Sequence, residues 1–474
     1  MAGIDIKILP EFSAIGAAER KATVVVELTP PPAPRARPAA RIVMALDVSG
    51  SMTGEKMRTA VASAQALVRS LGPADSFACV SFADRVQTLV PPLSTNASGK
   101  AIACEKLASA HPDGSTDLAA AALAALKIAN EAPEGGRALL LTDGCPTVGV
   151  IDGDQIVALA KGATGRSTLS TFGFGRDVDA PILSGLADVG KGNYTFIETG
   201  EPPMQAIGAE LGGMLLTVAA DVSLTLHPSP GVKIDRVFRP DGVSTDEKTG
   251  AVTIALPPLI AEEPVYVAVE LSWVETASIK SLALVTTRGR LTRDGSLHIQ
   301  EAHVVLETLT SRGAPNPDAI REIIIARAAV LLDQMSRGQT PPYKEAIQEL
   351  TEKLGELGGV AQAAGLENDA QVSAALAMIR SAREAFEKNA AGAQQDMVAS
   401  AAALKRKRST YTGVGTNLPY GTFVTRSQVL GAKLIVDNQG APDPKASPNQ
   451  PGQGPSGNQN RLNDDDDPGP NSRR

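Results

Sequence analysis

Three oxygen-bearing side chains occur at alternate positions in the segment ALDVSGSM: Asp47, Ser49 and Ser51. They come at the end of RIVMALDV, an apolar run typical of a strand that is buried on both faces of a parallel sheet. Gly50 permits a turn tight enough for the three side chains to face one point. Mg²⁺ takes about six oxygen ligands and keeps several waters, so a carboxylate and hydroxyls suit it. Alone, the segment fits a helix-capping cluster equally well.

Two later segments add oxygen atoms from other loops. DGSTDL places Thr116 just before an expected helix, and LLLTDG places Asp143 at the end of a second buried strand. Because ligand sites of parallel sheets form at the carboxyl ends of the strands, side chains from the three loops are expected to converge there. This convergence favours a divalent-metal site over capping. The predicted metal ligands are Asp47, Ser49, Ser51, Thr116 and Asp143.

Asp117, which follows Thr116, has two interpretations. It either caps its own helix or orients Thr116 from behind the metal site, and capping is the ordinary role of such a residue.

The elements that must position these residues alternate between strand and helix over 41–214. Repeated strand–helix units require crossover connections, which produce a parallel sheet covered by helices on both faces. We therefore predict a doubly wound α/β fold, in which the segment around Val90, Pro91 and Pro92 is a loop. The expected strands are RIVMALDV, SFACVSF, RALLLTDG, STLSTFGF and NYTFIE, and the expected helices lie near 54–71, 98–109, 117–130, 154–162, 179–188 and 203–214.

The rest of the chain divides by composition. Residues 1–40 contain two strand-like runs, IDIKIL and ATVVVEL, and a proline-rich linker, whereas 215–312 return to short β patterns separated by turns. We predict an all-β sandwich over 215–312. The runs in 1–40 are expected to complete it, so that the α/β domain is an insertion. The remaining expectations are a helical hairpin or bundle over 313–410, a returning strand segment over 411–437 and a disordered acidic tail over 438–474.

Bulk properties exclude several function classes. A net charge of −7 over 474 residues argues against a general nucleic-acid binder, which needs a basic face. Three cysteines without CxxC spacing favour neither a disulfide framework nor a thiolate zinc site. No run reaches the roughly 18 apolar residues of a membrane span, and the first residues do not have a signal-peptide pattern. We therefore predict a cytoplasmic protein that does not span a membrane.

The motif resembles the metal-ion-dependent adhesion site of the von Willebrand factor A family. That site is D-x-S-x-S, then a Thr in a (G)-x-T-D loop, then an Asp that ends a later strand. DVSGS, GSTD and TDG match it in order over about 41–214, and Ser115 stands where the family often has Gly. LGPADSFACVSF and LADVGKGNYTFIE also look like family segments. The resemblance implies that Ser49, Ser51 and usually Thr116 bind the metal directly, while the two aspartates often act through waters.

The resemblance also implies a function. The metal, Mg²⁺ by default with Mn²⁺ or Ca²⁺ as alternatives, would accept a Glu or Asp of a partner protein as a remaining ligand. We therefore predict a non-enzymatic, metal-dependent protein–protein interaction module. Family members inside bacterial cells often work with MoxR-type AAA+ ATPases, which makes such an ATPase a candidate partner.

Two alternatives remain open. One is a Mg²⁺-dependent hydrolase or phosphatase-like enzyme, for which the sequence offers no clearly placed base or nucleophile. The other is a scaffold whose site stays empty. The four histidines share no metal-ligand spacing, Cys145 is expected to be an inert thiol, and the basic run 405–408 closes the last helix. The histidines are His111, His227, His298 and His303.

Overall fold

The computed structural model describes most of the chain outside its last seventy residues. The described residues are 3–32, 39–175, 178–197, 216–239, 242–274, 281–292, 295–336, 343–387, 397–398 and 400–401. The helix expected at 203–214, the basic run 405–408, the strand expected in 411–437 and the tail 438–474 lie outside them. Within these ranges, none of the helices combines the length and apolar character that crossing a membrane requires.

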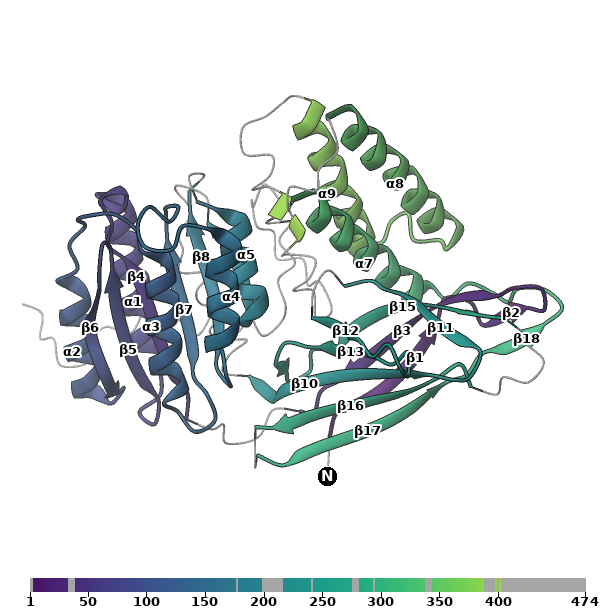
Figure 1. The fold of residues 1–474 in the computed structure, drawn as a ribbon, viewed down its shortest axis with the longest axis horizontal. Coiled ribbons are helices and arrows are strands. Elements are labelled where there is room, and N and C mark those ends of the chain that lie inside the picture. The colour runs from purple at the N-terminus through teal and green to yellow at the C-terminus, as the bar shows by residue number, and fades with distance from the viewer. Residues whose placement is uncertain are drawn as a thin grey trace, which may run out of the picture. The chain divides into compact units, whose positions relative to one another are not determined.

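Residues 39–197 form an α/β structure around a six-stranded sheet in the order β6-β5-β4-β7-β8-β9 (Figure 1). Strand β4 is central, and β5, β4, β7, β8 and β9 run parallel to one another. The carboxyl ends of these five strands therefore share one edge. The strands are β4 (Arg41–Asp47), β5 (Ser76–Phe82), β6 (Val86–Ser94), β7 (Arg137–Thr142), β8 (Thr168–Phe174) and β9 (Lys191–Ile197).

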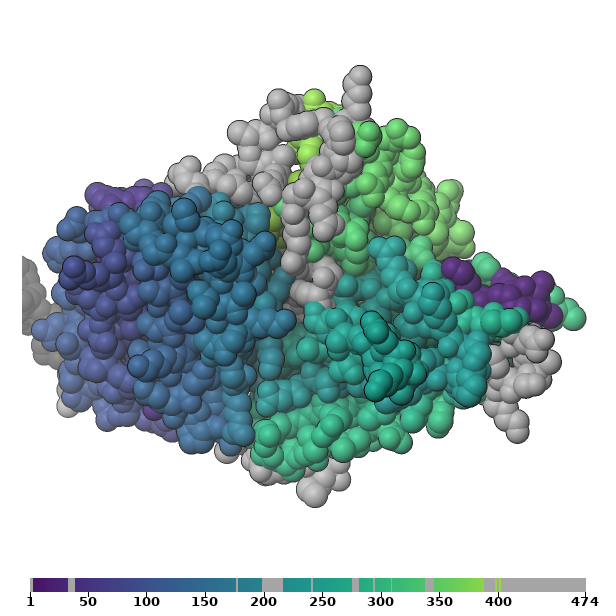
Figure 2. Space-filling view, viewed as in Figure 1, coloured from purple at the N-terminus to yellow at the C-terminus, as the bar shows by residue number. Residues whose placement is uncertain are grey.

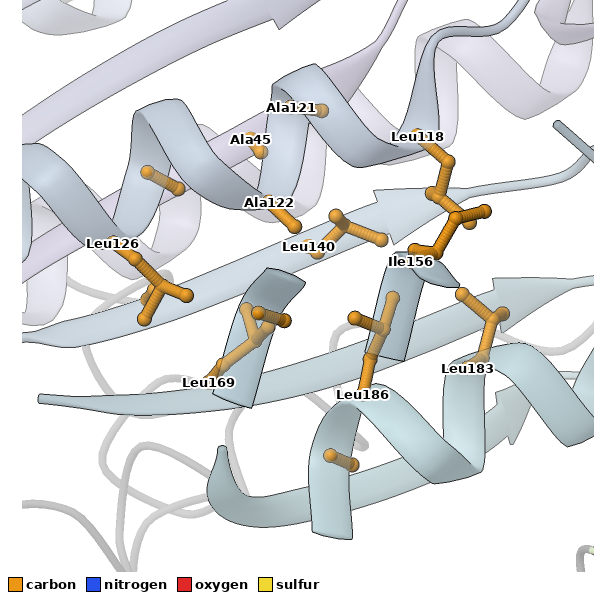
Figure 3. Close-up of a cluster of buried hydrophobic side chains, with 14 of the residues drawn as sticks. Ala45, Leu118, Ala121, Ala122, Leu126, Leu140, Ile156, Leu169, Leu183 and Leu186 are labelled. Carbon is orange, nitrogen blue, oxygen red and sulfur yellow. The ribbon is translucent and has the colours of Figure 1, made fainter. Parts of the chain in front are cut away.

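The two faces of this sheet are buried in separate apolar clusters. On β4, Val43 and Ala45 enter one cluster with α3, α4 and α5, while Ile42, Met44 and Leu46 enter the other with α1 and α2. Figure 3 shows the first cluster, where Leu140 of β7 lies under the helices. Figure 2 shows the outer surface of this part of the chain, coloured purple to blue. The helices are α1 (Glu55–Ser70), α2 (Ala97–Ala108), α3 (Leu118–Asn130), α4 (Gly153–Ala163) and α5 (Ala180–Val189).

Strand β6 corrects one expectation from the sequence. The segment around Val90, Pro91 and Pro92 was expected to be a loop, but it lies in a strand that pairs antiparallel with β5. The pairing register shifts where the two prolines fall, between the pairs Phe77–Leu93 and Cys79–Val90. An edge strand accepts proline because one of its sides needs no N–H donors. The sheet is consequently mixed, with one antiparallel strand at its edge.

Two further sheets share a third apolar cluster. One has the order β1-β3-β15-β11, and the other has the order β12-β13-β10-β16-β17 with β14 paired to β10. Side chains such as Val26 and Val267 of the first sheet and Leu224 and Val285 of the second belong to the same buried cluster. The strands are β1 (Asp5–Pro10), β3 (Lys21–Thr29), β10 (Thr217–Pro228), β11 (Val232–Val237), β12 (Val243–Thr245), β13 (Val252–Ala255), β14 (Leu259–Ile260), β15 (Val265–Trp273), β16 (Ala283–Leu291) and β17 (Leu297–Val304).

Strands from distant parts of the chain complete the smaller of these sheets. Strand β3 lies between β1 and β15, and Leu28 pairs with Val265. A short parallel pair also joins β2 (Ala14–Gly16) to β18 (Glu307–Leu309). The α/β segment is thus inserted, in sequence, between strands that belong to one sheet.

Three helices follow the strands: α7 (Pro317–Ser336), α8 (Tyr343–Ala363) and α9 (Ala370–Glu387). They share an apolar cluster of their own. A polar contact also links two of these helices: Arg321 of α7 donates a 2.8 Å hydrogen bond to Asp369. The Asp369 carboxylate also caps the N-terminus of α9. Helix α7 also packs on the smaller sheet, where Ile323 shares a cluster with Val25.

Candidate metal centre

The first loop of the candidate site leaves β4 at Asp47. Asp47 Oδ1 accepts a 2.7 Å hydrogen bond from the amide of Ser49, which turns the chain immediately after the strand. The amide of Gly50 then donates to the carbonyl of Gly114 at 3.0 Å. This bond ties the loop after β4 to the loop that carries Thr116, before the chain continues through a 3-10 turn (Gly50–Met52) into α1.

Hydroxyl and carboxylate groups of three loops meet at this edge. Ser49 Oγ and Ser51 Oγ are 3.0 Å apart, and Ser51 Oγ donates to Asp143 Oδ1 at 2.7 Å. A Cβ atom placed on Gly144 would lie 3.5 Å from Thr116 Oγ1 and 3.7 Å from Ser51 Oγ. The structure therefore brings the predicted residues of the three loops together.

Hydrogen bonds fix the Thr116 loop against its neighbours. The amide of Thr116 donates to Thr147 Oγ1 at 2.9 Å, and the amide of Thr147 returns a bond to the Thr116 carbonyl at 3.0 Å. The amide of Ser115 donates to Asp84 at 2.8 Å. Asp117 caps α3, since its Oδ1 accepts from the amide of Ala120 at 3.0 Å.

The two carboxylates of the site are buried. Asp47 is fully buried, and the side chain of Asp143 has no exposed surface. Burial raises the pKa of Asp47, which is partly offset by hydrogen bonds from Thr142 and Ser49, while the nearby Asp143 carboxylate raises the pKa further. Among the described residues, no cationic side chain forms an ion pair with Asp47. A buried carboxylate without a cationic partner is costly, so this environment favours a bound cation.

Two functional neighbours were missed from the sequence. Thr142 Oγ1 donates to Asp47 Oδ2 at 2.5 Å and also accepts from the amide of Gly144 at 3.2 Å. Lys56 Nζ lies 2.5 Å from Asp143 Oδ2, with the lysine side chain 29% exposed. In the sequence, only their positions beside predicted site residues point to these two side chains. Thr142 directly precedes Asp143, and Lys56 lies in the first turn of the helix that follows the first loop.

The donor set decides which metals fit. In the described part of the chain, His, Cys, Asp and Glu side chains do not gather in groups of three or more that could hold a metal. A metal at this edge would therefore depend on the hydroxyls of Ser49, Ser51 and Thr116 together with the two aspartates and water. Hard oxygen donors of this kind fit Mg²⁺, Mn²⁺ or Ca²⁺ and disfavour metals that prefer sulfur or nitrogen.

The other singled-out residues have local contacts. His111 Nδ1 lies 2.6 Å from the Ser109 carbonyl, and His298 Nε2 lies 3.1 Å from the Ile4 carbonyl. Cys79 is buried, and burial raises the pKa of its thiol, which suppresses the reactive thiolate. Cys145 is exposed.

The fold and this site define a class of α/β domain whose sheet edge presents side-chain oxygen atoms from three loops. Residues 40–196 match the family model of the von Willebrand factor type A domain. "Uncharacterized protein YfbK" of Escherichia coli (strain K12) is 34% identical over 199 residues, which are 41% of this chain and 34% of that protein. "Inter-alpha-trypsin inhibitor heavy chain H1" of Mesocricetus auratus is 33% identical over 155 residues, which are 30% of this chain and 17% of that protein. The matches thus span about a third or less of these relatives.

Solved structures resemble a larger part of the chain. The von Willebrand factor type A protein from Catenulispora acidiphila has a TM-score of 0.62 at 19% identity, covering 80% of this chain and 89% of that one. The ArnB paralog VWA2 from Sulfolobus acidocaldarius has a TM-score of 0.57 at 18% identity, covering 86% and 100%. At these identities the likeness concerns the fold alone. Together, these comparisons support a von Willebrand factor type A domain, a general protein-interaction module, at residues 40–196.

Proposed function

We propose that this chain is a metal-dependent protein-interaction module. A divalent cation, Mg²⁺ by default and Mn²⁺ or Ca²⁺ otherwise, would be held at the sheet edge and would accept an Asp or Glu side chain of a partner protein. The observation that carries the proposal is the convergence of two buried carboxylates with hydroxyl groups from separate loops. The proposed metal ligands are Asp47, Ser49, Ser51, Thr116 and Asp143.

The composition of the site explains why it would select an acidic partner. Three of its five side chains are neutral hydroxyls, so the protein supplies only two negative charges to a doubly charged ion. The bound metal would supply a positive, electrophilic centre, which favours an anionic ligand from outside. Ser51 is exposed whereas the other four residues of the site are buried, so that ligand would approach from the side of Ser51.

The location and the partner extend this proposal. We propose a cytoplasmic, non-enzymatic role, with a MoxR-type AAA+ ATPase as the candidate partner. The support for a non-enzymatic role is the hydrogen bonding of the site, in which Asp47 and Asp143 are engaged by hydroxyls, an amide and Lys56. Hydrogen bonds to both carboxylates reduce the capacity of each to act as a general base toward a water molecule.

The test is capture of a partner from native lysate by the full chain, in Mg²⁺ and in EDTA. Asp47→Asn removes one charge without changing side-chain size, and Ser51→Ala removes one exposed hydroxyl. Asp246→Asn, on an exposed turn outside the α/β domain, is the matched charge control. We expect the partner to bind the wild type and Asp246→Asn in Mg²⁺ only, and to be lost from both site variants. Replacing the partner's acidic residue with its amide should also abolish capture. Equal binding by all variants in EDTA would exclude metal-mediated capture.

A further inference from the structure

The charge balance at the site assigns a role to Lys56. We propose that Lys56 is a built-in counter-cation: it neutralises Asp143 when the site holds no divalent ion and gives up this contact when one binds. Lys56 thereby sets the affinity of the site for metal. This inference rests on the proposed function, since it concerns the regulation of the same site.

The contact geometry is the first observation behind the proposal. Asp143 Oδ2 is 2.5 Å from Lys56 Nζ, and Asp143 Oδ1 accepts from Ser51 Oγ at 2.7 Å. Both oxygens of this buried carboxylate are therefore occupied by the protein. A metal ion that uses Asp143, directly or through water, has to share a fully engaged carboxylate with an ammonium group.

The position of Lys56 in its helix is the second observation. Lys56 is the second residue of α1, and the N-terminal end of a helix carries a partial positive charge that disfavours a lysine. Gly54 at the N-cap has φ +86° and provides no side-chain cap that would compensate. Helix stability therefore does not account for a lysine at this position, whereas the charge of Asp143 does.

The third observation is that the lysine can leave. Its side chain is 29% exposed, while that of Asp143 has no exposed surface. A lysine ammonium is strongly hydrated and sits on a flexible four-carbon stem, so it can move into water at small cost. The carboxylate cannot follow it. With Mg²⁺ in place, the two carboxylates are already neutralised, and an ammonium that stayed would be an excess positive charge beside the ion.

The experiment measures Mg²⁺ and Mn²⁺ binding to the full chain by isothermal titration calorimetry. Lys56→Met removes the charge at similar length, and Lys56→Arg keeps it. Lys127→Met is the matched control, because Lys127 lies in the last turn of α3, about 15 Å along the helix from its cap. Heat released by Asp47→Asn is subtracted as binding elsewhere, including at the acidic run 464–467.

We expect Lys56→Met to bind both ions about tenfold more tightly, the size of one charged hydrogen bond that no longer competes. Lys56→Arg and Lys127→Met should match the wild type. The thermal stabilisation given by Mg²⁺ should also be larger for Lys56→Met than for the wild type. If Lys56→Met does not fold without metal, Lys56→Gln, which retains a hydrogen-bond donor for Asp143, decides the outcome by the same criterion.

Two results would overturn the inference, and they can be told apart. If the wild type binds Mg²⁺ but the charge-free variants bind no more tightly, Lys56 does not compete with the ion, and the proposed function still stands. If neither the wild type nor Lys56→Met binds more metal than Asp47→Asn does, there is no metal site at this edge, and the proposed function falls together with the role of Lys56.

Discussion

Replacing Thr142 with valine tests whether the environment of Asp47 is held by a charged hydrogen bond. Thr142 is fully buried, and its hydroxyl donates to Asp47 Oδ2 at 2.5 Å. Valine keeps the shape but removes the donor, and it leaves the amide of Gly144 without this acceptor. A hydrogen bond to a charged group contributes about 1.5–3 kcal/mol, so we expect the free energy of opening of this sheet edge to fall by about 2 kcal/mol.

The matched control is Thr171→Val in the neighbouring strand β8. Thr171 is also fully buried, but its hydroxyl donates at 2.8 Å to a neutral group, the carbonyl of Leu183. A neutral hydrogen bond contributes about 1 kcal/mol. The two substitutions are chemically identical, so their difference reports the charged acceptor on Asp47 together with the acceptor that the Gly144 amide loses.

Hydrogen exchange followed by mass spectrometry measures both effects in the intact chain, in EDTA, through peptides from β4 and β7 for Thr142→Val and from β8 and α5 for Thr171→Val. A loss of about 2 kcal/mol speeds exchange about thirtyfold, and a loss of about 1 kcal/mol speeds it about fivefold. If Thr142→Val accelerates exchange no more than Thr171→Val does, Asp47 is not an ionised carboxylate that depends on this donor, and the reasoning is refuted.

Three further predictions concern stability, each measured by urea unfolding followed by circular dichroism. Leu140→Ala should cost about 2–5 kcal/mol, because Leu140 is fully buried between β7 and the helices that cover it; a cost below 1 kcal/mol would contradict the described packing. Gly192→Ala should cost about 1–3 kcal/mol, because the new Cβ would lie 2.1 Å from the backbone carbonyl oxygen of Leu169; an unchanged transition would contradict that close approach. Burial of Asp369 raises its pKa, but hydrogen bonds from helix amides and from Arg321 outweigh burial and hold the pKa below its usual value. The stability that Asp369 contributes is therefore present above pH 3.8 and lost as the pH falls through its lower folded-state value, and Asp369→Asn should show no such loss.

The sequence could predict those residues of the candidate site whose positions depend only on where a strand ends. Asp47 is the last residue of β4 and Asp143 directly follows β7, and these two strands are parallel neighbours, so the pattern placed both residues at one edge of the sheet. Lys56 was not predictable in this way. Its contact depends on how α1 leaves the loop and on the extension of a long side chain, which neither spacing nor periodicity determines.

The fold followed the sequence where periodicity was strong and departed from it where local rules conflicted with tertiary pairing. The continuous apolar run over Arg41–Asp47 predicted a strand buried on both faces of the sheet, and the structure has one. Pro91 and Pro92 indicated a loop because proline lacks a donor, yet the partner strand needs only one side of β6. The three-residue strands β2 and β18 carry no periodic signal at all, and they pair only because the chain brings them together.

The insertion of the α/β segment has a consequence for synthesis. Leu28 cannot meet its partner Val265 until 237 more residues have been made, which takes about 12–47 s at the usual rates of translation of about 5–20 residues per second. During this interval β3 exposes Val24 and Val26, which end fully buried, together with an unpaired strand edge. The α/β domain can finish folding in the same interval, because all its strands are translated before β15. The nascent chain thus carries an ordered domain after the β1–β3 hairpin, whose sheet is still incomplete, and this hairpin is the part that most needs protection from aggregation.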